Sequence, residues 1–285
     1  MTGTEGTDTR RADVGGRHTE PAAPTAKLRL GGMALRNGLL VHGPTHWAAA
    51  VRTESGAIRT ASGRKPRLRA AHPIPGVRGV VRLAEAFAVI PLVKRALPEA
   101  KLPFQDPGVI AVGAGASLGG TLLRRRARGV GGEAAAAAVS FMPALFALRA
   151  GDLAAYHGVE HKAIGAYEAD DDDARDATKE HERCGSHLVA PMLASNLAGT
   201  LLLRGAVEKP GPLAGGAVAL ASSAVAVEVF AWCERHAGTR VARALKRPGF
   251  EIQRLVGTRE PDERQLEVGR AALAEILRVE GVAGA

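Results

Sequence analysis

Aromatic residues and cysteine are scarce in this chain of 285 residues. Aromatic side chains make up only 4% of the sequence, although hydrophobic residues make up 46%. Ala, Leu and Val supply most of that apolar content and Gly is also abundant. Helices built from these residues bury little area each but pack closely. Cysteine occurs only at Cys184 and Cys233, which excludes a fold held together by a disulfide framework.

Several signatures of known chemistry are also missing. The sequence has no Walker-type phosphate loop and no pattern of a Ser-His-Asp triad, and its glycine-rich runs lie inside apolar segments rather than after a strand. The net charge of +9 suits either nucleic acid or anionic lipid. Because no segment alternates basic with aromatic residues and no zinc-finger signature occurs, we expect the lipid bilayer, and no nucleic acid, as a partner.

The two ends of the chain differ in character from its middle. Residues 1–27 are polar and lack the apolar core of a signal peptide, so we expect a disordered tail. Residues 28–100 predict a small β-rich unit, with a hairpin turn at 54–56, followed by a helix over 79–97 that Pro91 breaks. Residues 233–285 form a basic C-terminal region whose last part predicts an amphipathic helix starting near Pro261.

The segment from 107 to 232 contains four uncharged apolar runs. They are Pro107–Leu123, Ala134–Leu148, Leu188–Leu203 and Gly211–Val227. Each is somewhat shorter than the about 20 residues that a membrane-spanning helix takes, so a soluble bundle of Ala-rich helices is the alternative. Arginines at the ends of the first and third runs, and small residues four apart, favour membrane spans.

These runs predict a mainly α membrane protein with about four transmembrane helices, a small β-rich N-terminal unit and a C-terminal amphipathic helix. The connection 150–187 between the second and third runs is an insertion that carries the polar motifs. An even number of spans would place this connection and both terminal regions on one side of the cell membrane. The arginines of 124–128 favour a cytoplasmic position for the first short loop, whereas the basic terminal regions favour the opposite orientation. We expect the termini to be cytoplasmic, because the long C-terminal region holds many cations.

The sequence Tyr156-His-Gly-Val-Glu-His-Lys162 is the most informative stretch for chemistry. On a helix, His157 and His161 lie one turn apart on the same face and can bind one metal ion. Glu160 lies beside them, where it can act as a general base that activates water, and the order H-x-x-E-H is the inverted-zincin pattern. The alternative is that both imidazoles bond carboxylates or lipid headgroups.

A metal ion needs at least a third protein ligand, and the sequence offers three candidates. His181 and Cys184 have side chains that zinc prefers, at a spacing of three residues. Glu228 adjoins the fourth apolar run, where a carboxylate usually has a partner or a function. Cys184 also fits a small buried residue at a turn. Arg183 could hold an anionic group of a substrate.

Taken together, four blocks of this sequence resemble the YqhQ family of bacterial membrane proteins, the domain-of-unknown-function family thirteen eighty-five. The blocks are residues 31–52, 156–162, 181–185 and 248–268. The resemblance implies several membrane-spanning helices in the middle of the chain, and members of the family are sometimes described as predicted metal-dependent enzymes. This chain departs from the family pattern at Met33 and Asn37, where Gln and Glu are usual, and at Ser186, where Thr is usual. The segment Val256-Gly257 before Thr258 is a further departure.

Two functions from different classes follow as hypotheses. The first is a metal-dependent enzyme of the hydrolytic type, in which a divalent ion such as zinc acts on an unknown substrate. The second is a membrane scaffold or assembly factor without catalysis, whose polar motifs form a structural network and bind a partner protein. A transporter is a weaker third option, because Glu228 is the only carboxylate beside a late apolar run.

Overall fold

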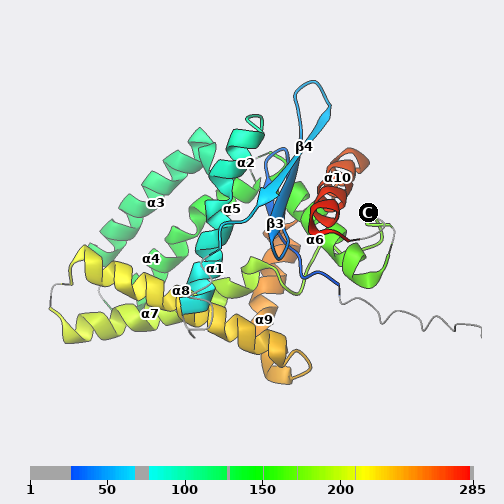
Figure 1. The fold of residues 1–285 in the computed structure, drawn as a ribbon. Coiled ribbons are helices and arrows are strands. Elements are labelled where there is room, and N and C mark those ends of the chain that lie inside the picture. The colour runs from blue at the N-terminus through cyan, green and yellow to red at the C-terminus, as the bar shows by residue number, and fades with distance from the viewer. Residues whose placement is uncertain are drawn as a thin grey trace, which may run out of the picture.

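The computed structural model combines a small antiparallel sheet with ten α-helices among the residues it describes. These are residues 27–67, 77–126, 129–149, 151–171, 173–208 and 210–282. Four helices from the middle of the chain lie together on one side, and the sheet lies with two others on the opposite side (Figure 1). The first group is α3 (Pro107–Arg126), α4 (Val130–Ser140), α7 (Val189–Ala206) and α8 (Pro212–Arg235), and the second is α6 (Leu153–Ala169) and α10 (Glu263–Glu280). The expected tail, 1–27, falls almost entirely outside the described residues.

The sheet is a meander of four strands in the order in which they occur in the chain. The strands are β1 (Gly31–Leu35), β2 (Gly38–His42), β3 (His46–Arg52) and β4 (Ile58–Arg64). β3 and β4 are joined by the predicted hairpin turn, in which Gly56 adopts φ +87°, a left-handed conformation that glycine takes without strain. The predicted β-rich N-terminal unit is confirmed.

Both faces of the sheet are covered, which explains why its inner strands are almost wholly buried. One face, with Leu39 and Val41, packs against α6 (Leu153–Ala169) and α10 (Glu263–Glu280). The other face, with Leu40 and Trp47, packs against α2 (Ile90–Ala96). Residues far apart in the sequence therefore share one core, and that core fixes α6.

The helices follow the predicted sequence signals at several points. The expected helix over 79–97 is divided into α1 (Val77–Ala88) and α2, with Pro91 in the first turn of α2, where its missing N–H is tolerated. α10 begins at a capping box formed by Asp262 and Gln265. Its apolar stripe, including Leu266 and Ile276, is buried against the sheet.

The apolar middle of the chain forms the remaining long helices. They are α3 (Pro107–Arg126), α4 (Val130–Ser140), α5 (Met142–Arg149), α7 (Val189–Ala206) and α8 (Pro212–Arg235). Short helical turns occur at η2 (Pro103–Gln105) and η3 (Gly185–Leu188), and α9 (Arg240–Ile252) continues into a π-helical turn, η4 (Gln253–Gly257).

Three helical segments of the described chain are long and apolar enough to cross a membrane. They are Val130–Arg149, which joins α4 and α5, Gly185–Ala206 and Pro212–Arg235. Only 22%, 6% and 11% of them, respectively, is buried inside the protein, so most of their apolar surface has no protein partner. The prediction of a protein with apolar spanning helices agrees with this, whereas the expected count of four is not confirmed. α3 is less apolar because it contains five glycines and ends in three arginines.

His42 gives the sheet a pH-dependent stability. It is only 8% exposed, neither ring nitrogen bonds a described residue, and burial, reinforced by the charge of Lys65, lowers its pKa to about 4. The folded state therefore binds fewer protons than the unfolded state between pH 6.5 and pH 4. We expect the free energy of unfolding to fall by about 3 kcal/mol as the pH is lowered through this window.

Unfolding measured at pH 7 and pH 4 in detergent tests this expectation. In a His42→Leu variant, the fall in the free energy of unfolding over the same pH window should be about 3 kcal/mol smaller than in the unsubstituted protein. His236→Gln, which removes an exposed imidazole at the end of α8, serves as the control and should leave the pH dependence unchanged. An identical loss in the His42→Leu variant would show that this imidazole does not cause it.

Candidate metal centre

His157 and His161 project from the same face of α6 toward the segment that precedes α7. The helix positions them one turn apart, and their ring centroids are 4.4 Å from each other. His161 is only 2% exposed, and His157 is half-buried. The structure thus brings the two imidazoles of the H-x-x-E-H motif together as the helical spacing predicts.

Hydrogen bonds to carbonyl groups fix the tautomer of both rings. Nδ1 of His157 lies 2.7 Å from the carbonyl oxygen of Gly257, and Nδ1 of His161 lies 2.6 Å from that of Lys179. A carbonyl oxygen can only accept, so each Nδ1 carries the proton and each Nε2 offers a lone pair. This arrangement orients metal-binding histidines in many proteins. Nε2 of His161 is buried and bonds no described residue.

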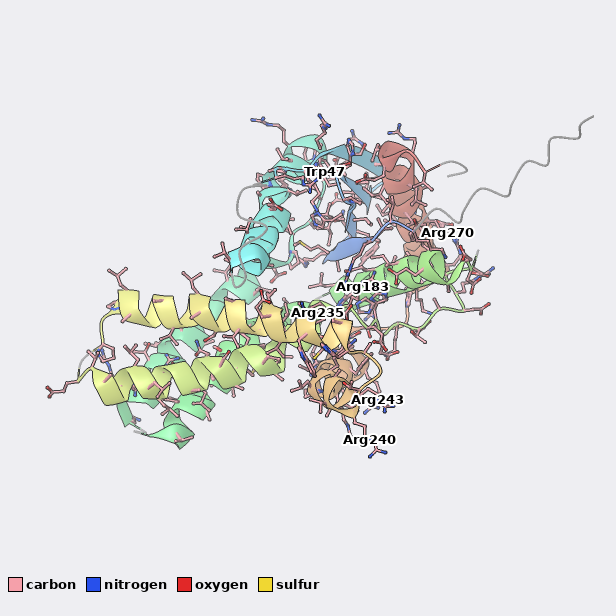
Figure 2. The ribbon with its side chains drawn as sticks, turned by 60° about the horizontal axis from the view of Figure 1, so that its bottom comes forward. Trp47, Arg183, Arg235, Arg240, Arg243 and Arg270 are labelled. Carbon is pink, nitrogen blue, oxygen red and sulfur yellow. The ribbon has the colours of Figure 1, made fainter. Side chains whose placement is uncertain are left out.

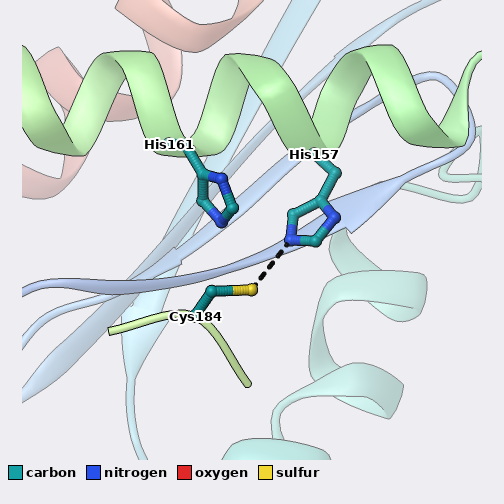
Figure 3. A group of neighbouring side chains, drawn as sticks. All are labelled: His157, His161 and Cys184. Atoms are coloured by element: carbon teal, nitrogen blue, oxygen red, sulfur yellow. Dashed lines mark hydrogen bonds between the residues drawn. The ribbon is translucent and has the colours of Figure 1, made fainter. Parts of the chain in front are cut away.

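Cys184 supplies a third donor atom beside the two rings. Its Sγ lies 3.4 Å from Nε2 of His157, and the candidate ligand atoms of the three residues all lie within 4.8 Å of one another (Figure 3). In a tetrahedral zinc site, Zn–N and Zn–S bonds of usual length separate a nitrogen from a sulfur by about 3.6 Å. The spacing, the buried lone pair and the donor types therefore fit a zinc-like ion.

The backbone around Cys184 is held by Gln253, which is fully buried at the end of α9. Its Oε1 accepts the N–H of His181 at 2.7 Å, and its Nε2 donates to Oγ of Ser186 at 2.9 Å. These bonds clamp the chain on both sides of Cys184. A further contact comes from His187, whose Nδ1 donates to the carbonyl oxygen of Lys246.

His181 lies next to the three residues, but its ring is engaged elsewhere. The N–H of Arg183 donates to Nδ1 of His181 at 3.2 Å, so Nε2 carries the proton and faces a carboxylate oxygen of Glu168 at 3.4 Å. Burial lowers the pKa of His181 more than the charge of Glu168 raises it. His181 is thus a neighbour of the cluster, with its ring centroid 5.7 Å from that of His161.

Arg183 and Glu228 are placed outside the cluster as well. Arg183 forms an ion pair with Glu168 through both terminal nitrogens, one of which also donates to the carbonyl oxygen of Leu30. This guanidinium therefore ties α6 to the start of the sheet. Glu228 lies in α8 and lines a groove with Val241 of α9. The group of three described ligand residues does not include it.

Glu160 points from α6 toward β1. The backbone N–H of Ala34 donates to its carboxylate, and burial raises the pKa of this carboxyl, while the nearby His157 lowers it less. Gly32 makes room for the side chain, because a Cβ there would lie 2.6 Å from Cγ of Glu160. The carboxyl is therefore poised to bind a proton closer to neutral pH than an exposed glutamate would.

Close backbone approach explains the glycine within the motif. A Cβ on Gly158 would lie 2.4 Å from the carbonyl oxygen of Arg259. The backbone N–H of Arg259 donates to the carbonyl oxygen of Ala154. The segment after η4 can therefore lie directly on α6 and bring Gly257 to His157. The carbonyl groups of Lys179 and Gly257 cannot be predicted from the sequence as partners of the two rings, because a backbone acceptor does not depend on residue type.

The two departures from the family pattern in the N-terminal block lie away from the cluster. Met33 packs on the face of the sheet that α2 covers. Asn37 lies in the turn between β1 and β2, where its side chain bonds the backbone of Arg52, Glu99 and Lys101. Both positions therefore serve packing and turn formation in this chain.

Comparison with known proteins places the cluster inside one family region. The family model described as protein of unknown function (DUF1385) matches residues 148–279, a range that includes α6, the cluster and α7 to α10. No curated protein and no solved structure matches the chain. The match agrees with the resemblance inferred from the sequence blocks.

Proposed function

Since this chain belongs to the DUF1385 family, whose description assigns no function, we propose its function from the site itself. The protein is a membrane protein that binds a zinc-like divalent ion through His157, His161 and Cys184. It uses this centre for a metal-dependent reaction of the hydrolytic type at the membrane surface. The observation that supports this proposal is that three donor atoms lie close together, two of them the Nε2 lone pairs of the histidines.

The histidines and Glu160 would have different roles in such a centre. A bound ion of this kind supplies Lewis-acid polarisation of a substrate oxygen. His157 and His161 hold their rings in place through the carbonyl groups of Gly257 and Lys179. Glu160 is the candidate proton acceptor, since its raised pKa brings it nearer to the operating range of a general base.

The positions of the ligands along the chain support a site at the membrane surface. Cys184 directly precedes the apolar segment Gly185–Ala206, and His157 follows the apolar segment Val130–Arg149 by eight residues. Both ligand-bearing segments are therefore anchored at ends of candidate spans. A substrate that reaches this site would approach at the level of lipid headgroups.

The shared core of the sheet, α6 and α10 supports an even number of crossings. Elements that pack in one core lie on one side of a bilayer, so the chain between any two of them returns to that side. α7 and α8 provide two crossings between α6 and α10. Between the sheet and α6, the α4–α5 segment provides one crossing, and one more is needed.

We infer that α3 is this missing crossing, which gives four in total. It has 20 residues, or about 30 Å of helix, and so matches the thickness of the hydrocarbon core. It packs along α4 and α5, and the arginines at its end can extend to the interface. The sheet and the metal centre then share one side, for which the cytoplasm remains our prediction.

A scaffold without catalysis is the second candidate, and one set of observations favours it. Several motif residues already serve the structure: Arg183 pairs with Glu168, and Lys162 is only 4% exposed, bonding the carbonyl groups of Arg175 and Ala177. Under this function, the metal would stabilise the fold, and the ordered surface would bind a partner protein.

A Glu160→Gln variant separates the two candidates. Gln keeps the volume of the side chain and can still accept the N–H of Ala34, but it cannot take up a proton. We expect the purified variant to retain about one zinc per chain and its unfolding temperature, because Glu160 is outside the ligand set. We expect it to fail to complement a host strain that lacks the protein.

Zinc content is measured by elemental analysis, stability by thermal unfolding, and function by complementation at equal membrane level. Full complementation by Glu160→Gln would contradict the role of this carboxyl in a reaction. Loss of folding instead of loss of function would favour the scaffold.

A further inference from the structure

α9 follows α8 after a short turn and presents three different surfaces. Residues Ala242, Lys246 and Gly249 recur at helical spacing and are buried against the segment that carries Cys184. This inner stripe makes α9 part of the support of the metal centre, because Lys246 also pairs with Glu182 and Glu234.

An apolar stripe of α9, defined as Val241, Leu245 and Pro248, is exposed. Val241 is 58% and Leu245 39% exposed, and Pro248 follows at the next helical position on the same side. The described residues cover these side chains only in part. An apolar stripe at helical spacing on an otherwise charged helix is the pattern of helices that lie in the plane of a membrane interface.

The apolar stripe is continuous with the outer surface of α8. Val241 and Leu245 line a groove of about 520 Å³ with four residues of α8, the apolar Val229 and Trp232 and the charged Glu228 and Arg235. Val229 and Trp232 lie in the last turns of a candidate membrane span. Tryptophan is enriched at the level of lipid headgroups, where its ring contacts both the lipid acyl chains and water. The groove therefore lies at the depth at which α8 leaves the bilayer.

A basic stripe, defined as Arg240, Arg243 and Arg247, occupies another side of α9. All three are exposed, and Figure 2 shows Arg240 and Arg243 pointing away from the body of the molecule. In the described residues, none of the three has an ion-pair partner. Their charge is complementary to the anionic headgroups of a bilayer.

We propose that α9 is an in-plane helix that docks on an anionic lipid surface, with its apolar stripe in the acyl region and its basic stripe among the headgroups. This inference rests on the proposed membrane location. The inner stripe of α9 packs against the segment that carries Cys184. A bilayer that fixes the position of α9 would therefore also fix the position of this ligand. The occupant is lipid because the stripe continues the apolar surface of α8.

Fluorescence quenching by brominated lipids tests this docking in the full chain. The native tryptophans, Trp47 and Trp232, are replaced by Phe, and one new Trp is introduced in each variant. In bilayers brominated near the headgroup end of the chains, we expect quenching of Val241→Trp to exceed that of Arg243→Trp at least about twofold. These positions lie on different stripes of the same helix, so they form a matched pair.

Two further comparisons make the result decisive. Leu220→Trp, at an exposed position in the middle of α8, reports whether this helix spans the bilayer. Strong quenching of Leu220→Trp by deeply brominated lipid, together with equal quenching of Val241→Trp and Arg243→Trp, would overturn the docking of α9. The membrane location of the protein would then still stand. Absence of quenching at Leu220→Trp would overturn the membrane location itself.

The anionic nature of the partner is tested by lipid composition. We expect the quenching of Val241→Trp to rise when anionic lipid replaces zwitterionic lipid, and the double substitution Arg240→Gln with Arg247→Gln to abolish this rise. The control is Arg270→Gln with Arg278→Gln, two arginines of α10 that pair with Glu263 and Glu275 within that helix. A rise that survives the α9 substitutions, or no rise at all, would overturn the assignment of an anionic surface.

Discussion

Replacing His157, His161 or Cys184 singly by Ala is expected to weaken zinc binding by about a hundredfold or more. A structural zinc site with four ligands contributes about 10 to 16 kcal/mol, so one ligand corresponds to roughly 3 kcal/mol. In this chain all three donors converge within 4.8 Å, and the neighbouring His181 is engaged with Glu168 and Arg183. The loss should therefore be of similar size at each position.

Zinc competition with a chromophoric chelator, in detergent, measures these affinities. Cys233→Ala is the matched control for the thiol, because Cys233 is also buried but lies in α8, and it should leave the affinity unchanged. His181→Ala should weaken binding less than any of the three ligand substitutions, since its ring bonds Glu168 and Arg183. If His181→Ala abolished binding while His161→Ala did not, the ligand set proposed here would be wrong.

Gly158→Ala is expected to lower the free energy of unfolding by about 3 kcal/mol. The added Cβ would lie 2.4 Å from the carbonyl oxygen of Arg259, and backbone cannot yield as a flexible side chain does. The displaced segment also carries the carbonyl of Gly257, which orients His157. We therefore expect a loss of zinc affinity of about tenfold to a hundredfold in addition.

Gly165→Ala provides the matched control in the same helix. A Cβ there would meet only Cβ of Ala177, at 3.9 Å, which is ordinary contact. This variant should gain up to about 1 kcal/mol, because alanine favours the helical state over glycine. Both variants are compared by thermal and denaturant unfolding in detergent. Equal stability of the two would refute the steric role of Gly158.

The parts of the site that could be predicted are those that depend on local spacing. The H-x-x-E-H order places His157 and His161 on one face of any helix, whatever surrounds it. The third donor could not be chosen from the sequence, because His181 and Cys184 lie in an irregular segment without periodicity. Contacts from Gln253, 69 residues after Cys184 in the sequence, fix that segment and thereby select the cysteine.

The roles of Arg183 and Glu160 depended on tertiary partners in the same way. The sequence left Arg183 available for an anionic substrate, but Glu168 occupies it in the folded chain. Glu160 was expected beside the histidines, and its carboxylate is also held by β1 from the N-terminal sheet. Whether it acts in a reaction remains a prediction.

By itself, the sequence determined the kinds of element present: an N-terminal hairpin, apolar helices, an amphipathic C-terminal helix and two histidines one turn apart. These follow from periodicity and residue type, which act over a few residues. Only the tertiary structure decided that the sheet, α6 and α10 share a core and that Cys184 completes the cluster. Such choices depend on packing and hydrogen bonds between segments that lie far apart in the sequence, which local patterns do not encode.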